Sequence, residues 1–200
     1  MRARRSSFVM LITLLAPALL MLSGCGVNKI PTLDERVKAA WSQVLNEYQR
    51  RADLIPNLVK VVAGYAHQEQ TVLTQVTEAR AKATQLQLPE NVLSNPQVFH
   101  EFEQRQAALG TSLGRLLALS ESYPALKSDQ NFLALQSQIE GTENRIAVAR
   151  RDYIIAVQNY NTELRTFPSR WTAELLYPKL KVRQTFTISA HAEELPQVKF

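Results

Sequence analysis

Polar residues in the first half of the chain have the types that could act as a base, an acid or an anion-binding group. They are Arg50, Arg51, Asp53, Asn57, His67 and Glu69. General acid–base catalysis would use His67 or Asp53 as the base, and it requires groups that converge within hydrogen-bond reach. On one continuous helix these two residues lie about 20 Å apart, because each residue adds about 1.5 Å. Direct cooperation between them would therefore require the chain to fold back near Pro56.

An alternative interpretation gives the same residues structural roles. Pro56 has no backbone N–H, so it leaves the carbonyl group four residues earlier without its helical partner. Asp53 and Asn57 could bind backbone groups that Pro56 leaves unpaired, and Arg51 could donate to a carboxylate on another helix. No nucleophile elbow, phosphate-binding loop or metal-ligand spacing accompanies the cluster. We therefore expect no catalytic residues, no bound metal and no cofactor.

A second polar cluster lies in "ENRIAVARRDY", in the second half of the chain. Arginine can bind a carboxylate through two hydrogen bonds, so pairing between the two clusters would hold two helices in register. The faces at residues 53–57 and 143–152 could instead bind a partner protein. The residues that we expect in inter-helix or partner contacts are Arg51, Asp53, Asn57, Glu69, Glu143, Arg145, Arg150 and Arg151.

The polar clusters lie on predicted helices. Apolar residues recur at steps of three and four from Leu33 onward, which is the spacing of one helix face. This spacing predicts a first helix over residues 32–88, about 80 Å long if Pro56 bends it without breaking it. A second helix should begin at Asn95 and Pro96 and stop at Pro124, and a third should begin after Ser128 or Asp129 and end at residues 167–168. A short fourth helix is predicted over residues 169–176. The pattern predicts an all-α fold, an elongated antiparallel bundle of three long helices plus a short fourth, followed by an extended tail.

The only cysteine, Cys25, follows three arginines and an apolar stretch of residues 8–22. This order is typical of an export signal, and about 15 apolar residues are fewer than the roughly 20 that span a bilayer. The sequence "LSGC" is similar to the bacterial lipobox, in which Cys25 would receive a diacylglycerol. Cleavage would fall between Gly24 and Cys25, and the new amino group would receive a further acyl chain such as palmitate. Two or more acyl chains give a stable membrane anchor.

These features predict four segments and a location. The segments are a signal peptide at residues 1–24, a lipidated tether at 25–31, the helical bundle at 32–178 and the tail at 179–200. Gly26 stands where an aspartate tends to retain lipoproteins in the inner membrane, so we expect the outer membrane facing the periplasm if the host is Gram-negative. The alternative is a single-pass inner-membrane protein in which residues 8–22 remain as a helix. A lone cysteine excludes an internal disulfide.

The charge balance argues against nucleic acid as a partner. The chain has a formal net charge of +5, but three of its basic residues lie in the predicted signal, which leaves 20 basic residues against 18 acidic ones. The two signs are interleaved along the helices, as on an ordinary solvated surface. We expect the membrane and an unidentified envelope protein as partners, and the oligomeric state stays open.

Two long motifs are similar to the LemA family of bacterial envelope proteins. They are "AWSQVLNEYQRRADLIPNLVKVVAGYAHQEQTVLTQVTEARAKA" at residues 40–83 and "TENRIAVARRDYIIAVQNYNTELRTFPS" at residues 142–169. The resemblance implies a membrane-anchored antiparallel helical bundle outside the cytoplasm, with no established enzymatic activity or cofactor. This chain departs from the family in having a lipobox where many relatives have a spanning helix. Its His67 is also displaced by one position, which on a helix is a rotation of about 100°.

The sequence thus favours a lipid-anchored, non-enzymatic scaffold or interaction module of the cell envelope. The alternative function is an envelope hydrolase or ligand sensor that uses polar residues of the first and third helices. A closed pocket that contains His67 would favour the alternative. A solid core with the polar groups at its rim would favour the scaffold.

Overall fold

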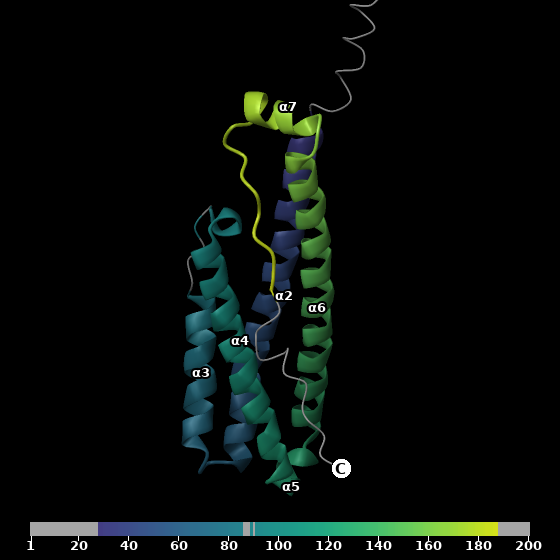
Figure 1. The fold of residues 1–200 in the computed structure, drawn as a ribbon. Coiled ribbons are helices and arrows are strands. Elements are labelled where there is room, and N and C mark those ends of the chain that lie inside the picture. Colours follow the sequence, from purple (N-terminus) through teal and green to yellow (C-terminus); the bar gives the residue numbers. More distant parts are fainter. Residues whose placement is uncertain (1–27, 86–88, 90, 188–200) are drawn as a thin grey trace, which may run out of the picture.

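The computed structural model describes residues 28–85, 89 and 91–187, and Figure 1 shows their arrangement. Within these residues the chain is helical and contains no β-strand, which confirms the predicted all-α bundle. The longer helices are α2 (Lys29–Tyr65), α3 (Gln70–Thr84), α4 (Pro96–Ala118) and α6 (Gln130–Arg165). Short elements are the 3-10 turns Val92–Ser94 and Leu119–Glu121 and the helices α5 (Pro124–Lys127) and α7 (Ser169–Leu176). The predicted signal, Cys25 and the last part of the tail lie outside the described residues.

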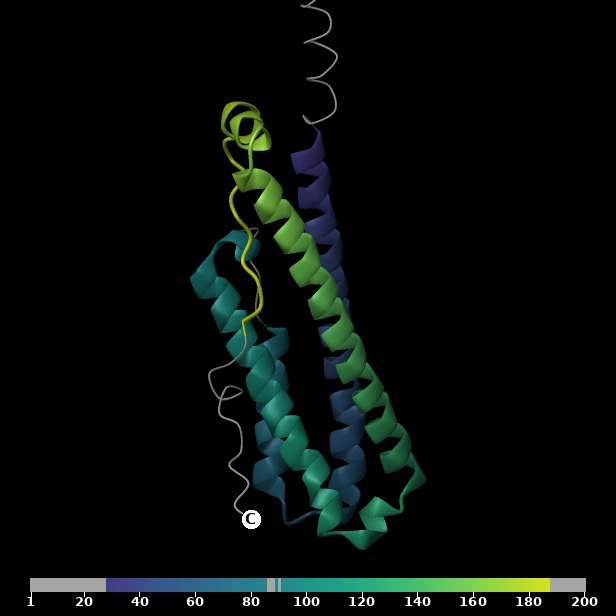
Figure 2. The same ribbon diagram turned by 45° about the vertical axis from the view of Figure 1, so that its right-hand side comes forward.

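The bundle is long and uneven in thickness. Helices α2 and α6 run antiparallel along its whole length, whereas α3 and α4 flank only the half that lies lower in Figures 1 and 2. Helix α7 lies across the end at which α2 begins, and the chain then returns along the bundle. None of the helices in residues 28–85 and 91–187 is long and apolar enough to cross a membrane.

The predicted first helix is in fact two helices, so the expectation of one rod over residues 32–88 is wrong. Helix α2 ends at Tyr65, the chain reverses, and α3 runs back beside α2. The turn is closed by backbone hydrogen bonds from Ala66 to Val62 and from Glu69 to Ala66. The apolar spacing continues across the turn because Ala66 and Leu73 are buried in the same core. The pattern therefore shows the buried face but hides the reversal.

Pro56 neither breaks α2 nor leaves its helical acceptor unpaired. The carbonyl oxygen of Ala52 lacks an N–H partner from Pro56, and the Nε atom of Arg80 on α3 donates to it at 2.8 Å. Asp53, which we expected near this defect, instead accepts from Gln49 at 2.7 Å, because a carboxylate has no proton to give to a carbonyl. The defect at Pro56 thus becomes a tie between α2 and α3.

The predicted helix starts are confirmed where a cap was identified. The side chain of Asn95 accepts from the backbone N–H groups of Gln97 and Val98, with Pro96 in the first turn of α4. The side chain of Asp129 accepts from the N–H of Phe132 and starts α6. Helix α4 ends before Pro124, with a 3-10 turn between them. Capping oxygens satisfy donors that a helix leaves unpaired at its first turn.

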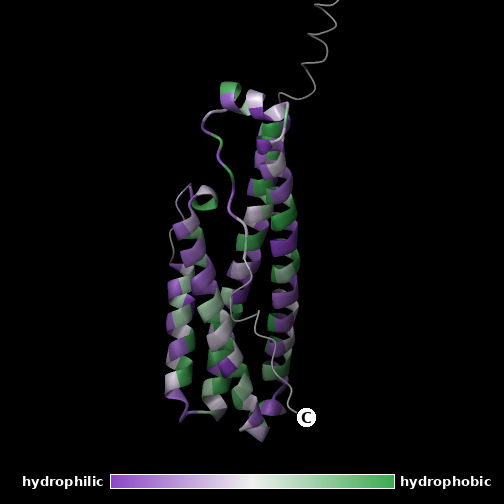
Figure 3. Cartoon of the chain, viewed as in Figure 1, coloured by the Kyte–Doolittle hydropathy of each residue, from purple (hydrophilic) through white to green (hydrophobic). Residues whose placement is uncertain are grey.

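The buried side chains form two separate cores. The first, the aromatic core, surrounds Trp41 with Phe99, Phe102, Tyr153 and Phe186 at ring-centroid distances of 5.1–6.2 Å. The second, the aliphatic core, fills the four-helix half with leucine, isoleucine and valine side chains. Figure 3 shows apolar and polar residues alternating along the long helices, as expected when each helix buries one face.

The aromatic core is closed by residues 177–187, which we name the C-terminal strap. Arg183 forms an ion pair with Asp34 of α2 at 2.6 Å, and both side chains are largely buried. The hydroxyl groups of Tyr153 and Tyr160 donate to strap carbonyls, at 2.7 Å and 3.1 Å. Burial raises the pKa of both tyrosines, so they remain neutral donors at physiological pH. The first part of the predicted tail is therefore draped on the bundle.

Removal of the Arg80 side chain should destabilise the protein through the Ala52 carbonyl. We expect Arg80→Met to lower the free energy of unfolding by about 1–2 kcal/mol, because a buried acceptor loses a charged donor. In a Pro56→Ala background the new N–H can bind that carbonyl, so the cost of Arg80→Met should fall by about half or more. Urea unfolding of the four proteins measures the coupling.

Arg105→Met is the matched control, because Arg105 donates to the carbonyl of Lys82, away from Pro56. Its cost should be the same in both backgrounds. An Arg80→Met cost that is equally unchanged by Pro56→Ala would contradict the assignment.

Candidate functional site

A layer of polar side chains separates the two cores. Along α2 the aromatic core ends at Tyr48 and the aliphatic core begins at Ile55, and along α6 the same change falls between Ile139 and Ile146. Polar and charged side chains meet at this height: Glu47, Arg51, Gln106 and Thr142 are buried, and Glu143 and Arg145, which pair with two of them, are about half exposed. We name this set the polar layer, and its members are Glu47, Arg51, Gln106, Thr142, Glu143 and Arg145.

Arg51 is the centre of the polar layer. Its side chain is only 4% exposed, and its Nη1 atom donates to Glu143 of α6 at 2.9 Å. Its Nη2 atom donates to the side-chain oxygen of Gln106 of α4 at 2.8 Å and to the backbone oxygen of the same residue at 3.2 Å. The guanidinium carbon lies 5.0 Å from the ring centroid of Tyr48. A single charge thus connects α2, α4 and α6.

A second ion pair also joins α2 and α6, but with its arginine on α6 and its carboxylate on α2. Glu47 of α2 accepts from the Nε atom of Arg145 of α6 at 3.1 Å, and Arg145 also donates to Thr142 at 3.0 Å. One pair has its arginine on α2 and the other has its arginine on α6. A slip of α6 along α2 would separate both pairs at once and leave buried charges without partners. The expected register contact between the two clusters is therefore present at Arg51 and Glu143.

The polar layer lies beneath a groove between α4 and α6. Two neighbouring cavities, of about 460 Å³ and 420 Å³, are both lined by Gly110 and Glu143, so they lie end to end along α4 and α6. The apolar walls of the groove include Leu113 and Leu117 on α4 and Ile139, Ile146 and Ile154 on α6. Phe186 and Thr187 of the C-terminal strap border one end. We name this feature the α4/α6 groove.

Two glycines keep the α4/α6 groove open. A Cβ atom added at Gly114 would meet nothing within 4 Å, and one added at Gly110 would meet only Arg51, at 3.8 Å. These glycines therefore do not serve close helix packing, and each leaves a space that a larger side chain would fill. The two glycines are four residues apart in "GTSLG" and so lie on one face of α4. This spacing is a sequence signal that could have indicated the groove.

The groove has little catalytic chemistry. Polar groups of α2 and α6 do meet in its larger cavity, as an enzyme would require, but Arg51 and Glu143 already neutralise each other. The residues that line the two cavities include no histidine, cysteine or serine. Tyr48 also lines the larger cavity, and burial raises the pKa of its hydroxyl, which disfavours it as a base. Across residues 28–85 and 91–187, no three His, Cys, Asp or Glu side chains are grouped to hold a metal ion.

The remaining predicted residues lie apart from this chemistry. His67 is exposed in the turn between α2 and α3, and Asp53 and Asn57 are exposed on α2. Glu69 directly precedes α3, where it accepts from the hydroxyl of Tyr123 at 3.2 Å. The chain reverses at residues 66–69 and not near Pro56, so α2 continues from Asp53 to Tyr65 and keeps Asp53 apart from His67.

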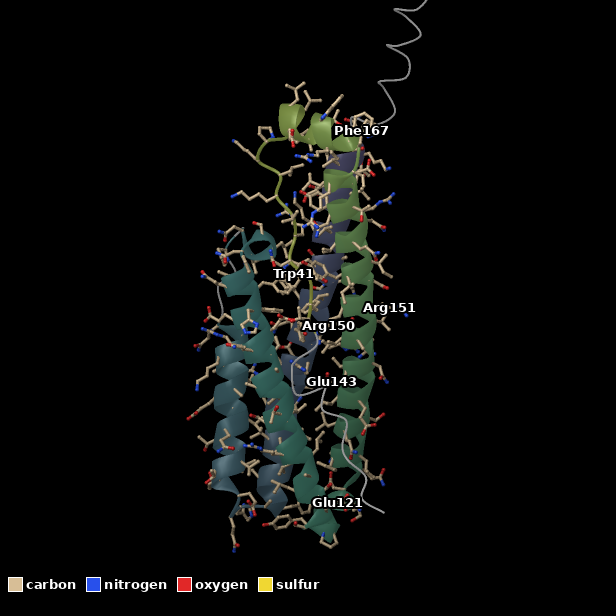
Figure 4. The ribbon with its side chains drawn as sticks, in the orientation of Figure 1. Trp41, Glu121, Glu143, Arg150, Arg151 and Phe167 are labelled. Carbon is tan, nitrogen blue, oxygen red and sulfur yellow. The ribbon has the colours of Figure 1, made fainter. Side chains whose placement is uncertain are left out.

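The two neighbouring arginines of α6 have different surroundings. Figure 4 shows Glu143 and Arg150 toward α4 and Arg151 on the outer side of α6. Arg150 lies 4.3 Å from the ring centroid of Phe186 and lines the groove, which links α6 to the C-terminal strap. Arg151 is exposed and pairs only loosely, at 3.4 Å, with the adjacent Asp152. Gln106, Gly110 and Gly114, all on α4, belong to the site but were not predicted.

Comparison with known proteins finds one matching family model and several relatives of moderate identity. The model of the LemA family matches residues 40–200. The magnetosome proteins MamQ 1 and MamQ 2 of Paramagnetospirillum magneticum are each 26% identical over 162 residues, which cover 73% of this chain and 60% of each relative. Protein LemA of Metamycoplasma hominis is 24% identical over 149 residues, which cover 74% of this chain and 61% of that protein. The chain thus spans about three-fifths of the length of these relatives.

Because Arg51 is buried and Glu143 is partly exposed, we expect a substitution at Arg51 to lower the free energy of unfolding more than one at Glu143 does. Arg51→Lys should lower the free energy of unfolding by about 2 kcal/mol, because an ammonium group cannot reach Gln106 and Glu143 together. Glu143→Gln should cost about 1 kcal/mol or less, since its side chain is 45% exposed and water can replace the contact. Urea unfolding measures both.

Arg151→Lys provides the control, because Arg151 is exposed, and its cost should be close to zero. If Arg51→Lys costs no more than Arg151→Lys, the polar layer does not depend on Arg51.

Proposed function

Because the chain belongs to the LemA family, we propose that it is a lipid-anchored, non-enzymatic interaction module of the bacterial cell envelope. The observation that carries this proposal is the α4/α6 groove, which has apolar walls and a floor whose charges are already paired. Such a surface can bind another protein but offers no group poised for catalysis. The names of the matched relatives state no reaction.

The anchor in this proposal is the acylated thiol of Cys25. Lys29, where α2 begins, lies only four positions after Cys25, and four extended residue steps reach at most about 14 Å. The acyl chains would therefore hold that end of the bundle close to the bilayer, and the four-helix half would point away from it. Gly26 after the cysteine supports the outer membrane, facing the periplasm, in a Gram-negative host.

The partner in this proposal is an envelope protein that contributes an amphipathic helix. Glu103 and Leu117, at opposite ends of the groove wall on α4, lie fourteen residues apart, which is about 21 Å or four helical turns. A helix with one apolar stripe of that length matches the apolar walls. Glu103 and Arg150 at the end near the C-terminal strap would set its direction through charge.

A ligand sensor is the second candidate function. It is favoured by the meeting of Tyr48, Arg51 and Arg150 in one cavity of about 460 Å³, a volume suited to a small molecule. A hydrolase has less support, because His67 lies in the exposed turn after α2 and lines neither cavity.

Intact mass and membrane fractionation test the anchor. We expect membrane-extracted protein to begin at Cys25 and to carry two or three acyl chains, and Cys25→Ala to abolish both the added mass and the cleavage, because the thiol is the acyl acceptor. A full-length, unmodified protein that stays in the membrane fraction without Cys25 would contradict the lipid anchor. That result would mean that residues 8–22 remain as a spanning helix.

Photocrosslinking in living cells tests the groove. A photoreactive residue at Ala107, which lines the groove, should crosslink to one envelope protein through an apolar helix face, whereas the same residue at Val148 should not. Gly114→Leu should abolish the crosslink, because its side chain would fill the groove without a backbone clash.

Gly64→Leu is the matched control, because a Cβ atom there also meets nothing within 4 Å and Gly64 lies on α2, away from the groove. It should leave the crosslink intact. Loss of the crosslink in both variants would contradict the groove as the binding site. A crosslink to residues 188–200 of the same chain would show that the protein's own tail is the occupant.

A further inference from the structure

Helix α7 and Phe167, two residues before it, carry the most exposed apolar side chains of the described residues. Leu175 is 82% exposed, Phe167 71%, Trp171 67% and Leu176 50%. Side chains of this size are ordinarily buried, and Trp171 contrasts with Trp41, which is 6% exposed in the aromatic core. Four such residues within ten positions form an exposed apolar patch, which marks an interaction surface.

Trp171 and Leu175 share the outer face of α7 because they lie one helical turn apart. Phe167, Trp171 and Leu175 follow one another at steps of four, and the rings of the first two pack edge to face at 4.9 Å. On the opposite side of α7, Ser169 and Ala173 are buried against the bundle. The apolar face of α7 therefore points away from the protein, as in helices that lie in a membrane interface.

The patch lies at the end of the bundle that the proposed anchor would hold at the membrane. Helix α7 crosses the end at which α2 begins (Figures 1 and 4). Lys29, the first residue of α2, pairs with Glu163 near the end of α6 at 2.7 Å, and this contact fixes the start of α2 beside the connection to α7. The reach of about 14 Å from Cys25 then brings α7 to the bilayer surface.

The charges beside the patch match an anionic bilayer. Arg165 precedes the patch and Lys179 follows it, and both residues are exposed. Tryptophan and phenylalanine prefer the interface between lipid and water, and neighbouring basic residues bind lipid phosphates. The one acidic residue of α7, Glu174, would oppose contact with anionic lipid, but Arg170 pairs with it at 2.9 Å across one helical turn.

We propose that α7 and the preceding Phe167 dock on a membrane, with the Phe167, Trp171 and Leu175 side chains entering the interface of a phospholipid bilayer. The contact orients the bundle, which an acyl anchor alone leaves free to tilt. This inference rests on the proposed anchor for its geometry, but attachment to the membrane and insertion of α7 are measured separately.

Depth-dependent quenching of tryptophan fluorescence tests the docking. Full-length membrane-extracted protein is reconstituted in vesicles of phosphatidylethanolamine and phosphatidylglycerol, with and without acyl chains brominated near the headgroup. In the Trp41→Phe variant, Trp171 is the sole reporter, and we expect about a twofold or greater loss of emission on bromination. In Trp171→Phe, the buried Trp41 should show no loss. Leu175→Ser in the Trp41→Phe background should weaken the quenching, and Leu133→Ser, an exposed leucine of α6, should not.

Two outcomes would overturn the docking. Trp171 could be unquenched by bromine and open to aqueous acrylamide in vesicle-attached protein, in which case α7 faces water. It could instead be protected from both quenchers, in which case a protein, such as a second copy of the chain, covers α7. Mass and fractionation of the same samples report the anchor, so a failed anchor and a failed docking give different results.

Discussion

The buried charge of Arg51 constrains the whole bundle. A guanidinium group in a protein interior needs acceptors for its N–H groups. Here Glu143 of α6 and the side chain and backbone of Gln106 of α4 supply them to the two terminal nitrogens, whereas the buried Nε atom has no hydrogen-bond partner among the described residues. The three helices α2, α4 and α6 must therefore keep one fixed axial position relative to one another. The aromatic core fills the space on one side of this layer and the aliphatic core fills the other. Apolar side chains make up most of the buried surface, but the buried charge sets the register in which the helices pack.

The residues that suggested chemistry are largely used to build the protein. Arg51 belongs to the first motif that is similar to the LemA family and Glu143 to the second, and the two contact each other at 2.9 Å. Arg80, near the end of the first motif, binds the carbonyl that Pro56 leaves free. What remains for function is the shape that this framework leaves: an open groove between α4 and α6, and a short helix with an apolar outer face.

Local signals were sufficient to predict the all-α class, the caps at Asn95 and Asp129, and helix α7. They could not show that α2 and α3 are separate, because both helices bury the same spacing of apolar residues in one core. They also could not identify Gln106 as a partner of Arg51, or Arg183 as a partner of Asp34, since such pairs join residues 55 and 149 positions apart. The glycine pair of α4 marks an open face of that helix, but the α4/α6 groove also depends on how far apart the two helices lie, which no local pattern records.

The C-terminal strap also determines the order in which the molecule can be completed. A chain is synthesised from its N-terminus, and Trp41 and Asp34 lie well ahead of Phe186 and Arg183, which close the aromatic core over them. Closing so long a loop is slow, because its entropy must be lost before any contact forms. The four-helix half can fold first. In that intermediate the aromatic side chains are exposed to solvent and form a surface that is prone to aggregation. The aromatic core is therefore complete only after residues 177–187 have been synthesised and have packed on the bundle.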